Sequence, residues 1–375
     1  MRILHLVSYS LYSGPLPSTL RLACAQRDLG HDVWLAHDTR RGAFNDFEES
    51  ADPHIEATQI APPQKMTLSA KSPPIAVLRD IRTLRKLQKM AVDVVHVHLS
   101  HDHTLSYLAG RSGFSGIRVR TIHAQRSLKN RLGQRKLNRA ADGWIVRSKE
   151  HLQQLQRQIA ISENRIALIP GSIDTGEFRP ASPAERQKAR ERFEIPSDAQ
   201  VIGHTALMAG RGQEELIAAA DSVNHPNLHL LFVGRGEHEE RVQAKARASG
   251  MADRIHFTGY LQGHDLLEGY AAMDGAFSAQ AGNDASVRAV LEAMSCGLPV
   301  LGVQDGAIGE VITQEVGFGV ATRMPEDIAR GLKAFLDRQD GMGEKARQLM
   351  EAERTTVLEA QNTLSYYETC LRERV

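Results

Sequence analysis

The sequence alternates strand-like and helix-like segments along most of its length. Residues 3–7 form an apolar run, a helical pattern begins at Pro17 and ends near Gly30, and residues 33–36 form the next apolar run. A strand, a helix and a second strand in succession predict parallel pairing of the two strands, because the helix crosses back over the sheet. We therefore expect an α/β fold with doubly wound parallel sheets.

The same alternation continues through both halves of the chain. Further strands are expected at residues 94–97, 119–122, 143–146, 166–169, 201–204, 228–233, 255–257, 275–277 and 299–303. Helices are expected at residues 81–90, 105–110, 128–140, 150–159, 185–193, 214–221, 239–248, 265–272, 287–294 and 325–336, with one long or kinked helical run at 343–372.

The alternation breaks once, over residues 170–183. This segment, PGSIDTGEFRPASP, holds three prolines and two glycines, which is typical of a linker. A chain of 375 residues is also too long for a single core, since cores stop growing near about 250–300 residues. We predict an N-terminal domain over 1–172, completed by a C-terminal helix at about 350–375, and a C-terminal domain over 173–349. In this architecture ligands bind at the carboxyl ends of the strands, so we expect a central cleft.

Charge and cysteine content restrict the class of protein. Lys plus Arg number 46 against 45 Asp plus Glu, so the net charge of +1 predicts no nucleic-acid partner. The three cysteines are odd in number and widely spaced, which suggests neither a disulfide framework nor a zinc site. Without a signal-like start or an apolar run near the roughly 20 residues of a membrane span, we expect a cytoplasmic protein.

Residues 281–300, AGNDASVRAVLEAMSCGLPV, are the most informative segment of the chain. They place Asp284 and Glu292 eight positions apart around the start of a helix. Asp284 would lie at the amino end of that helix, where the N–H groups and the helix dipole attract phosphate. Glu292 would lie two turns further along. This geometry suits a nucleotide-diphosphate sugar.

The same segment resembles the E-x7-E region, followed by EAMACGLPV, of retaining glycosyltransferases of family 4, also called glycosyl transferases group 1, which have the GT-B fold of two Rossmann-like domains. The resemblance implies that Asp284 faces the donor sugar and that Glu292 binds the ribose hydroxyls. It also implies that Ser286 and Val287, after the first acid, line the donor site. Asp284 stands where the family has Glu, and Ala285 and Val287 stand where it usually has glycines.

Three further segments of the second half are similar to the same family. IPGSIDTGEFRP at 169–180 resembles the family's domain junction, and LLFVGRG at 230–236 resembles a strand and turn of its nucleotide pocket. IHFTGYLQ at 255–262 implies backbone contacts to the base from Tyr260 and Leu261.

GHTALMAGRGQEELIAAA at 203–220 is similar to the family's diphosphate-binding pattern, in which an Arg is followed five residues later by Lys-Gly. The resemblance implies that Arg211 and Gly212 match the Lys-Gly pair. Ala206 replaces the first basic residue, which removes one charge-assisted phosphate contact. Our hypothesis is that Arg288 replaces it.

The first half carries two further family matches. Gly14, in SYSLYSGPLP, corresponds to the glycine loop that approaches the donor phosphates, and His123, in RTIHAQ, resembles the strand-end histidine that hydrogen-bonds the donor sugar. A group of four further histidines, in VVHVHLSHDH, lies on or just after one strand: His96, His98, His101 and His103. Alternation predicts that one face of this strand is buried, so we expect strand-core and surface residues here and assign no metal.

The family mechanism implied is sugar transfer with retention of anomeric configuration. No protein nucleophile is evident, so the leaving diphosphate would take the acceptor's proton while Arg211, the helix start at Asp284 and Gly14 stabilise its charge. The sequence has no D-x-D motif. We therefore expect neither a metal nor another cofactor.

Basic residues are concentrated at 118–157, where eleven Lys and Arg stand against two acids. Leu128, Leu132 and Leu137 lie among them, as in a basic amphipathic helix that contacts anionic lipid or a phosphorylated, lipid-linked acceptor. An ordinary solvated face is the alternative.

The sequence thus predicts a bacterial, metal-independent hexosyltransferase of the retaining type. It would transfer a sugar from a nucleotide sugar to a glycan or lipid-linked acceptor in polysaccharide or lipopolysaccharide biosynthesis, at the inner face of the cell membrane. Two alternatives remain open. One is a UDP-sugar epimerase or hydrolase. The other is a degenerate, non-catalytic binding subunit, favoured by the departures at Ala206, Asp284, Ala285 and Val287.

Overall fold

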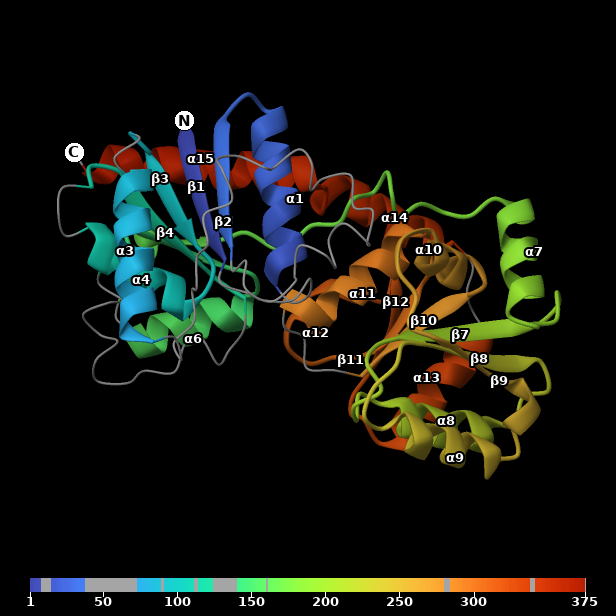
Figure 1. Cartoon of the computed structure of the whole chain (residues 1–375). Coiled ribbons are helices and arrows are strands. Elements are labelled where there is room, and N and C mark those ends of the chain that lie inside the picture. Colours follow the sequence, from blue (N-terminus) through green and yellow to red (C-terminus); the bar gives the residue numbers. More distant parts are fainter. Residues whose placement is uncertain are drawn as a thin grey trace. The chain divides into compact units, whose positions relative to one another are not determined.

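Figure 1 shows the computed structural model of the chain. The structure describes residues 1–7, 15–37, 73–88, 91–110, 114–123, 140–159, 161–279, 284–337 and 341–374. The chain divides into two compact units. Unit 1 comprises Met1–Ser172 and Thr356–Val375, and unit 2 comprises Ile173–Thr355.

Unit 1 contains one parallel sheet of six strands in the order β2-β1-β3-β4-β5-β6. Its strands are β1 (Arg2–Val7), β2 (Asp32–His37), β3 (Val94–Val97), β4 (Ile117–Ile122), β5 (Gly143–Val146) and β6 (Ile166–Leu168). Its helices are α1 (Pro15–Asp28), α3 (Pro74–Gln88), α4 (Ser100–Gly110), α6 (Lys149–Ile159) and α15 (Thr356–Arg374), with a short 3-10 helix at Glu163–Arg165.

Helices cover both faces of the sheet of unit 1, so most residues of its inner strands are buried. On one face Ile3 and Val119 pack with residues of α1 and α15, and on the other face Leu4 and Val95 pack with residues of α3 and α4. All four residues of β3 are buried. The expected burial of only one face of this strand is therefore wrong, since the sheet is a central layer rather than a surface layer.

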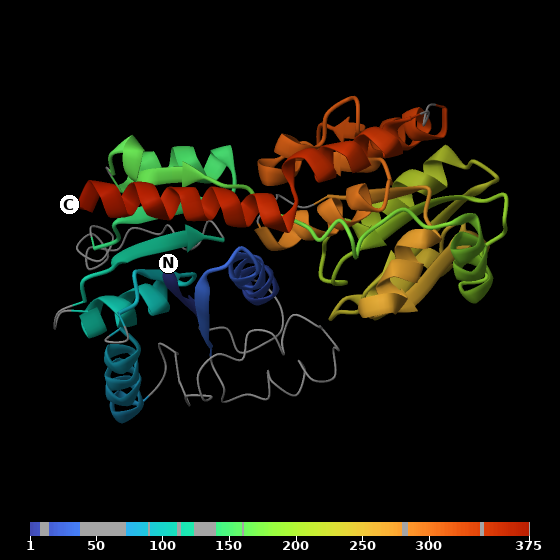
Figure 2. The same cartoon turned by 90° about the horizontal axis from the view of Figure 1, so that it is seen from above.

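Helix α15 belongs to unit 1 although it is the last helix of the chain. It packs against α1 and β4, and Figure 2 shows it running along the sheet of this unit. Its Tyr366 hydroxyl accepts a hydrogen bond from the backbone N–H of Trp144 (3.0 Å). Its Glu359 forms a buried ion pair with Arg147, with 2.6 Å between Oε1 and Nη1. The helix thereby completes the core of unit 1.

Unit 2 repeats the arrangement with the strand order β12-β11-β10-β7-β8-β9, again all parallel. Its strands are β7 (Gln200–Thr205), β8 (Leu228–Val233), β9 (Ile255–Gly259), β10 (Gly275–Ser278), β11 (Val300–Val303) and β12 (Gly317–Val320). Its helices are α7 (Pro183–Arg192), α8 (Gln213–Val223), α9 (Glu239–Arg247), α10 (Gly263–Ala271), α11 (Asp284–Ser295), α12 (Gly306–Val311), α13 (Pro325–Asp337) and α14 (Met342–Glu353), with a 3-10 helix at Ala252–Arg254.

The doubly wound α/β fold predicted from the sequence is confirmed, with two differences and one expected helix that is not tested. Strand β12 and helix α12 were not expected. The helical run expected over 343–372 is two helices, because the chain pairs with Ile173 at their junction: the Ile173 N–H donates to the Arg354 carbonyl (2.8 Å), and Thr355 forms an isolated parallel bridge with Ile173. The helix expected at 128–140 lies almost entirely outside the described residues.

Over the part of the chain that the structure describes, no helix combines the length and apolar character needed to cross a membrane.

Candidate functional site

The strand order of unit 2 reverses between β7 and β10. Strand β7 lies between β8 and β10 in the sheet. The loops after the adjacent strands β7 and β10 therefore lead away in opposite directions along the sheet. Ligands of doubly wound sheets bind at such a point, outside the carboxyl ends of the strands. The predicted donor residues Arg211 and Gly212 follow β7, and α11, which holds the predicted acids, follows β10.

Gly212 brings these two loops together. It is the N-cap of α8 in the left-handed conformation, with φ +103° and ψ 4°. A Cβ atom at this position would lie 2.6 Å from Cβ of Ala279 and 3.2 Å from the Phe277 ring, both at the end of β10. Only glycine satisfies the dihedral and the space together. The backbone therefore approaches β10 closely at the amino end of α8, where N–H groups point outward.

The loop before Gly212 is braced by Gln213, which the sequence reasoning missed. Its side-chain oxygen accepts from the Arg211 N–H, and its amide donates to the Leu207 carbonyl, both at 2.9 Å. Gln213 is only 1% exposed. Partial burial lowers the pKa of the Arg211 guanidinium, which remains a cation at neutral pH.

The loop after β8 covers the loop after β7. Met208 donates its N–H to the Arg235 carbonyl (3.0 Å) and accepts from the His238 N–H (2.8 Å). Gly234 has φ +140°, and a Cβ there would collide with the Ala206 carbonyl oxygen. The glycines of LLFVGRG thus permit backbone packing around Ala206, the position where a basic residue was expected.

Helix α11 begins at Asp284, as its predicted role requires, but the side chains of Asp284 and Ser286 lie outside the described residues. Val287 is 7% exposed and packs into the core of unit 2, so a donor contact from Val287 would have to come from its backbone.

Glu292 is the predicted site residue with the most defined surroundings. Its carboxylate is held from two sides: Oε2 accepts from the Tyr270 hydroxyl and Oε1 from Nε of Arg288, both at 2.7 Å. The residue is 3% exposed. Burial and the neighbouring Glu292 carboxylate raise the pKa of Tyr270 well above its usual value, so this hydroxyl stays protonated and donates. Sequence reasoning missed Tyr270, which lies on a different helix, α10.

Arg288 was expected to replace the missing phosphate contact at Ala206. The structure pairs it with Glu292 one helical turn away, with 38% of its side chain exposed. Its contact with phosphate remains a prediction.

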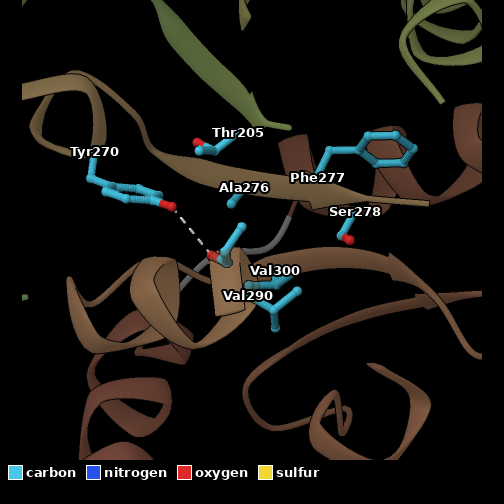
Figure 3. A pocket seen from close by; sticks show the side chains of 8 residues that line it. Thr205, Tyr270, Ala276, Phe277, Ser278, Val290 and Val300 are labelled. Atoms are coloured by element: carbon cyan, nitrogen blue, oxygen red, sulfur yellow. Dashed lines mark hydrogen bonds between the residues drawn. The ribbon is translucent and has the colours of Figure 1, made fainter. Parts of the chain in front are cut away.

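A pocket lies beneath α11, beside Tyr270 (Figure 3). Its lining residues come from β7, the chain around β10 and β11, α10 and α11, and are Thr205, Tyr270, Ala276, Phe277, Ser278, Ala289, Val290 and Val300. The lining is mostly apolar, and the Tyr270 hydroxyl points across it toward the Ala289 carbonyl (3.5 Å). This pocket lies where α11 packs on the sheet of unit 2.

Tyr260 and Leu261 follow β9, two strands away from β7 at the same end of the sheet. Tyr260 is 64% exposed, whereas Leu261 packs partly into the core of unit 2. Their predicted backbone contacts to a base remain a prediction.

In unit 1 the strand order reverses between β1 and β3. Gly14 lies in the loop after β1, outside the described residues. His123 directly follows β4 and is 6% exposed. His98, after β3, faces it: Nδ1 of His98 lies 3.0 Å from Nε2 of His123. His96, His98 and His103 are buried, and His101 is half-buried.

The basic stretch 118–157 is not a continuous surface. Arg118, Arg120 and Arg147 are 8%, 4% and 6% exposed. Arg120 lies over the Trp144 ring at 5.1 Å, and Arg118 donates to the Ala140 carbonyl (3.0 Å). These three cations therefore belong to the interior of unit 1 and not to a solvated basic face, because helices cover both faces of the sheet. Residues 124–139 lie outside the described residues.

Comparison with known proteins supports the interpretation of both units. The family model Glycosyltransferase Family 4 matches residues 17–177, and the model Glycosyl transferases group 1 matches residues 185–356. A GDP-mannose-dependent monoacylated alpha-(1-6)-phosphatidylinositol monomannoside mannosyltransferase of Corynebacterium glutamicum is 29% identical over 198 residues, which are 49% of this chain and 51% of that protein. The chain thus matches about half the length of this relative.

Solved structures share the whole fold. A glycosyltransferase from Rickettsia africae superposes with a TM-score of 0.83 at 20% identity, covering 99% of this chain and 98% of the other. Anabaena HepE in complex with UDP superposes with a TM-score of 0.80 at 17% identity, covering 98% and 100%. The predicted GT-B architecture is confirmed.

Proposed function

Because the chain belongs to the group 1 glycosyltransferases of the GT-B fold, we propose that it transfers a sugar from a nucleotide-diphosphate sugar to an acceptor hydroxyl. The observation that carries the proposal is the close approach of the loops after β7 and β10 at Gly212, at the point where the strand order of unit 2 reverses. Backbone N–H groups at two helix starts, with Arg211, suit a diphosphate. A buried, oriented carboxylate suits two ribose hydroxyls.

We assign the residues of unit 2 to the nucleotide and diphosphate, and His123 of unit 1 to the transferred sugar. Arg211 and the start of α11 would stabilise the charge that develops on the leaving diphosphate. The diphosphate oxygen would take the proton of the acceptor hydroxyl, with retention at the anomeric carbon. The chemistry needs no metal, so activity should survive EDTA.

The donor nucleotide and the acceptor follow by analogy. HepE was solved with UDP, and the Corynebacterium relative is named for GDP-mannose and a phosphatidylinositol mannoside. We propose a hexose donated by UDP or GDP and a glycan or lipid-linked acceptor of the cell surface. Contact with anionic membrane through residues 118–157 remains a prediction, and charge reversal at the exposed Lys149 and Arg157 with a vesicle-binding assay tests it.

Donor binding is tested by thermal unfolding of the protein with UDP-, GDP-, ADP- and CMP-sugars and their diphosphates. A ligand at 100 times its Kd stabilises the folded state by about 2.7 kcal/mol. We expect a rise in Tm with one nucleotide class, and its loss in Glu292→Gln. Glu268→Gln is the matched control, since Glu268 is a nearly buried carboxylate of the same unit that pairs instead with Lys188 and Arg192.

The absence of a cation at Ala206 keeps a second function open, a binding subunit without turnover. Donor binding without product formation over a panel of acceptors would favour it. Conversion of the donor alone to an isomer or free sugar would favour the epimerase or hydrolase alternative.

A further inference from the structure

Four buried side chains of unit 1 form a continuous hydrogen-bonded chain that ends at His123. Gln26 Oε1 lies 2.8 Å from Nε2 of His5, Nδ1 of His5 lies 3.0 Å from Nε2 of His98, and Nδ1 of His98 lies 3.0 Å from Nε2 of His123. Gln26, His5 and His98 are at most 1% exposed. We call these four residues the histidine chain.

The sheet register explains why these residues meet. His5 of β1 is the register partner of His96 of β3, and His96 is the partner of Val119 of β4. Side chains two residues apart share a face, so His98 and His123 lie on the same face as His5. Figure 1 shows β1, β3 and β4 in the sheet of unit 1, and helix α1, which carries Gln26, packs against β1 and β2.

With Oε1 of the Gln26 amide facing His5, the hydrogen bonds assign a proton to one nitrogen of each ring. The Gln26 carbonyl oxygen can only accept, so Nε2 of His5 carries a proton and Nδ1 of a neutral His5 accepts. Nε2 of His98 must then donate to His5, which leaves Nδ1 of His98 as an acceptor. Nε2 of His123 must donate to that nitrogen. The chain of hydrogen bonds therefore places a proton on Nε2 of His123.

The rings at the inner end of the chain are neutral. Burial lowers the pKa of His5 to about 4 and the pKa of His98 well below its usual value. The histidine chain also ends at an amide, Gln26, which neither takes up nor releases a proton at neutral pH. It therefore orients His123 and does not conduct protons away from it.

We propose that His98, His5 and Gln26 are positioning residues that hold His123 as the Nε2–H tautomer and fix the orientation of its ring. This inference rests on the proposed function for the role of His123. The tautomer itself does not depend on that role, and it has its own measurement.

A metal ion is the competing explanation for the cluster. One ring nitrogen each from His5, His96 and His98 lies within 4.8 Å of the others. Both nitrogens of His96 already have hydroxyl partners, Thr121 at 2.6 Å and Tyr367 at 2.5 Å. His5 and His98 are likewise satisfied by each other and by Gln26 and His123. Hydrogen bonds between protein side chains therefore account for these contacts of all three rings without an ion.

The test is nitrogen NMR of the full-length protein labelled with 15N-histidine, which distinguishes protonated from unprotonated ring nitrogens. We expect His123 as the Nε2–H tautomer in the parent protein and a mixture of tautomers in Gln26→Leu, although Gln26 is three hydrogen bonds away. His98→Leu should give the same mixture, and His98→Asn should restore Nε2–H because its side-chain oxygen can replace Nδ1 as acceptor. Thr121→Val is the control, since it removes a buried partner of His96 and leaves the chain intact.

Activity supplies the second readout. In His98→Leu we expect kcat to fall about 5- to 10-fold, with KM for the donor changed less than about twofold, and recovery in His98→Asn. A His123 tautomer unchanged in both Gln26→Leu and His98→Leu would overturn the proposal. So would equimolar Zn²⁺ shifting the His5 and His98 signals as bound ligands. If His123→Ala keeps full activity, the role of His123 in the proposed function fails, while the tautomer measurement still decides whether the chain orients it.

Discussion

At the scale of single residues, the support of Glu292 is the feature with the most direct functional consequence. Its carboxylate is almost entirely removed from water and depends on two donors, Tyr270 and Arg288. When a buried carboxylate loses a hydrogen-bond donor, its removal from water is no longer compensated, and the folded state is destabilised. The orientation of Glu292 is therefore set by residues that would not themselves touch ribose.

Tyr270→Phe removes one donor and leaves the ring in place. We expect the free energy of unfolding to fall by about 1.5–3 kcal/mol and donor affinity to fall about 3- to 10-fold. Calorimetric titration and urea unfolding measure the two effects. Tyr366→Phe is the control, because it removes a buried hydroxyl of unit 1 that bonds the Trp144 N–H; it should lower stability alone. Equal donor affinity in both variants would contradict the assigned role of Tyr270.

Gly212→Ala tests the close approach of the two loops. The new methyl group would lie 2.6 Å from Ala279 Cβ, and residue 212 has a φ of +103°. A strained backbone alone costs about 1–3 kcal/mol. Because the clash adds to this strain, we expect the free energy of unfolding to fall by more than that amount and donor binding to be lost. Gly341 is also a left-handed N-cap in unit 2, and a Cβ added there would meet nothing within 4 Å. Gly341→Ala should show the strain alone. If the free energy of unfolding falls equally in the two variants and both still bind donor, the close approach of the two loops at Gly212 is not needed for donor binding.

The sequence indicated several of these residues and could not indicate others. Glu292 and Gly212 stand in local patterns of spacing and turn chemistry. Tyr270 lies 22 residues before Glu292, and no local pattern connects the two. The histidine chain combines β1, α1, β3 and β4, so each histidine is visible in the sequence and their alignment follows only from the sheet register.

At the scale of elements, helix α15 adds one buried ion pair to the apolar contacts that attach it to unit 1. The side chains of Arg147 and Glu359 are 3% and 2% exposed, and Glu359 also accepts from the Ser172 hydroxyl (2.5 Å). Arg147 in turn donates to the Ile169 carbonyl (3.1 Å). The pair thus joins the helix to the end of β5 and to the chain that leaves β6.

Glu359→Gln leaves Arg147 as an uncompensated buried cation. We expect unit 1 to lose about 3–5 kcal/mol and the amide protons of α15 to exchange faster. The double variant Arg147→Met, Glu359→Leu should regain most of this loss, because two apolar side chains replace the pair. Hydrogen exchange read by mass spectrometry measures both. A double variant less stable than Glu359→Gln would show that the pair contributes net stability.

Elements with strong hydrophobic periodicity were predicted well. Short elements were not, and neither was an element boundary that depends on contacts remote in the sequence. Strands β3, β5 and β8 have the expected bounds. Strand β12 was missed because GFGV has two glycines in four residues, and α12 because it has only six residues. The break between α14 and α15 depends on pairing with Ile173, which is remote in the sequence.

At the scale of the whole molecule, both units bury histidines that must stay neutral. Burial lowers the pKa of His5 in unit 1 and of His204 in unit 2 from 6.5 to about 4. Between these two values the unfolded chain binds more protons than the folded chain, so the free energy of unfolding rises with pH across this window. Each histidine then contributes about 2 kcal/mol less stability at pH 5 than at pH 7.5.

We expect urea unfolding to show this loss in both units on going from pH 7.5 to pH 5. His204 packs against Phe232 and Phe277, and its Nε2 has no partner among the described residues. His204→Phe should therefore reduce the pH dependence of unit 2, even though it loses the hydrogen bond to the Phe277 carbonyl, and the remaining part comes from His229, whose pKa is also lowered to about 4. An unchanged pH dependence in this variant would mean that His204 titrates normally in the folded protein.

The placement of α15 has a consequence for the order of synthesis. Leu364, Tyr366 and Tyr367 fill the core of unit 1 beside Ile3 and Val119, yet a ribosome makes them only after all of unit 2. The unit that is translated first is therefore completed last. Until the last helix leaves the ribosome, part of one face of the first sheet is exposed to solvent in the nascent polypeptide. Chaperones bind exposed apolar surface, so this is the interval in which we expect them to bind unit 1.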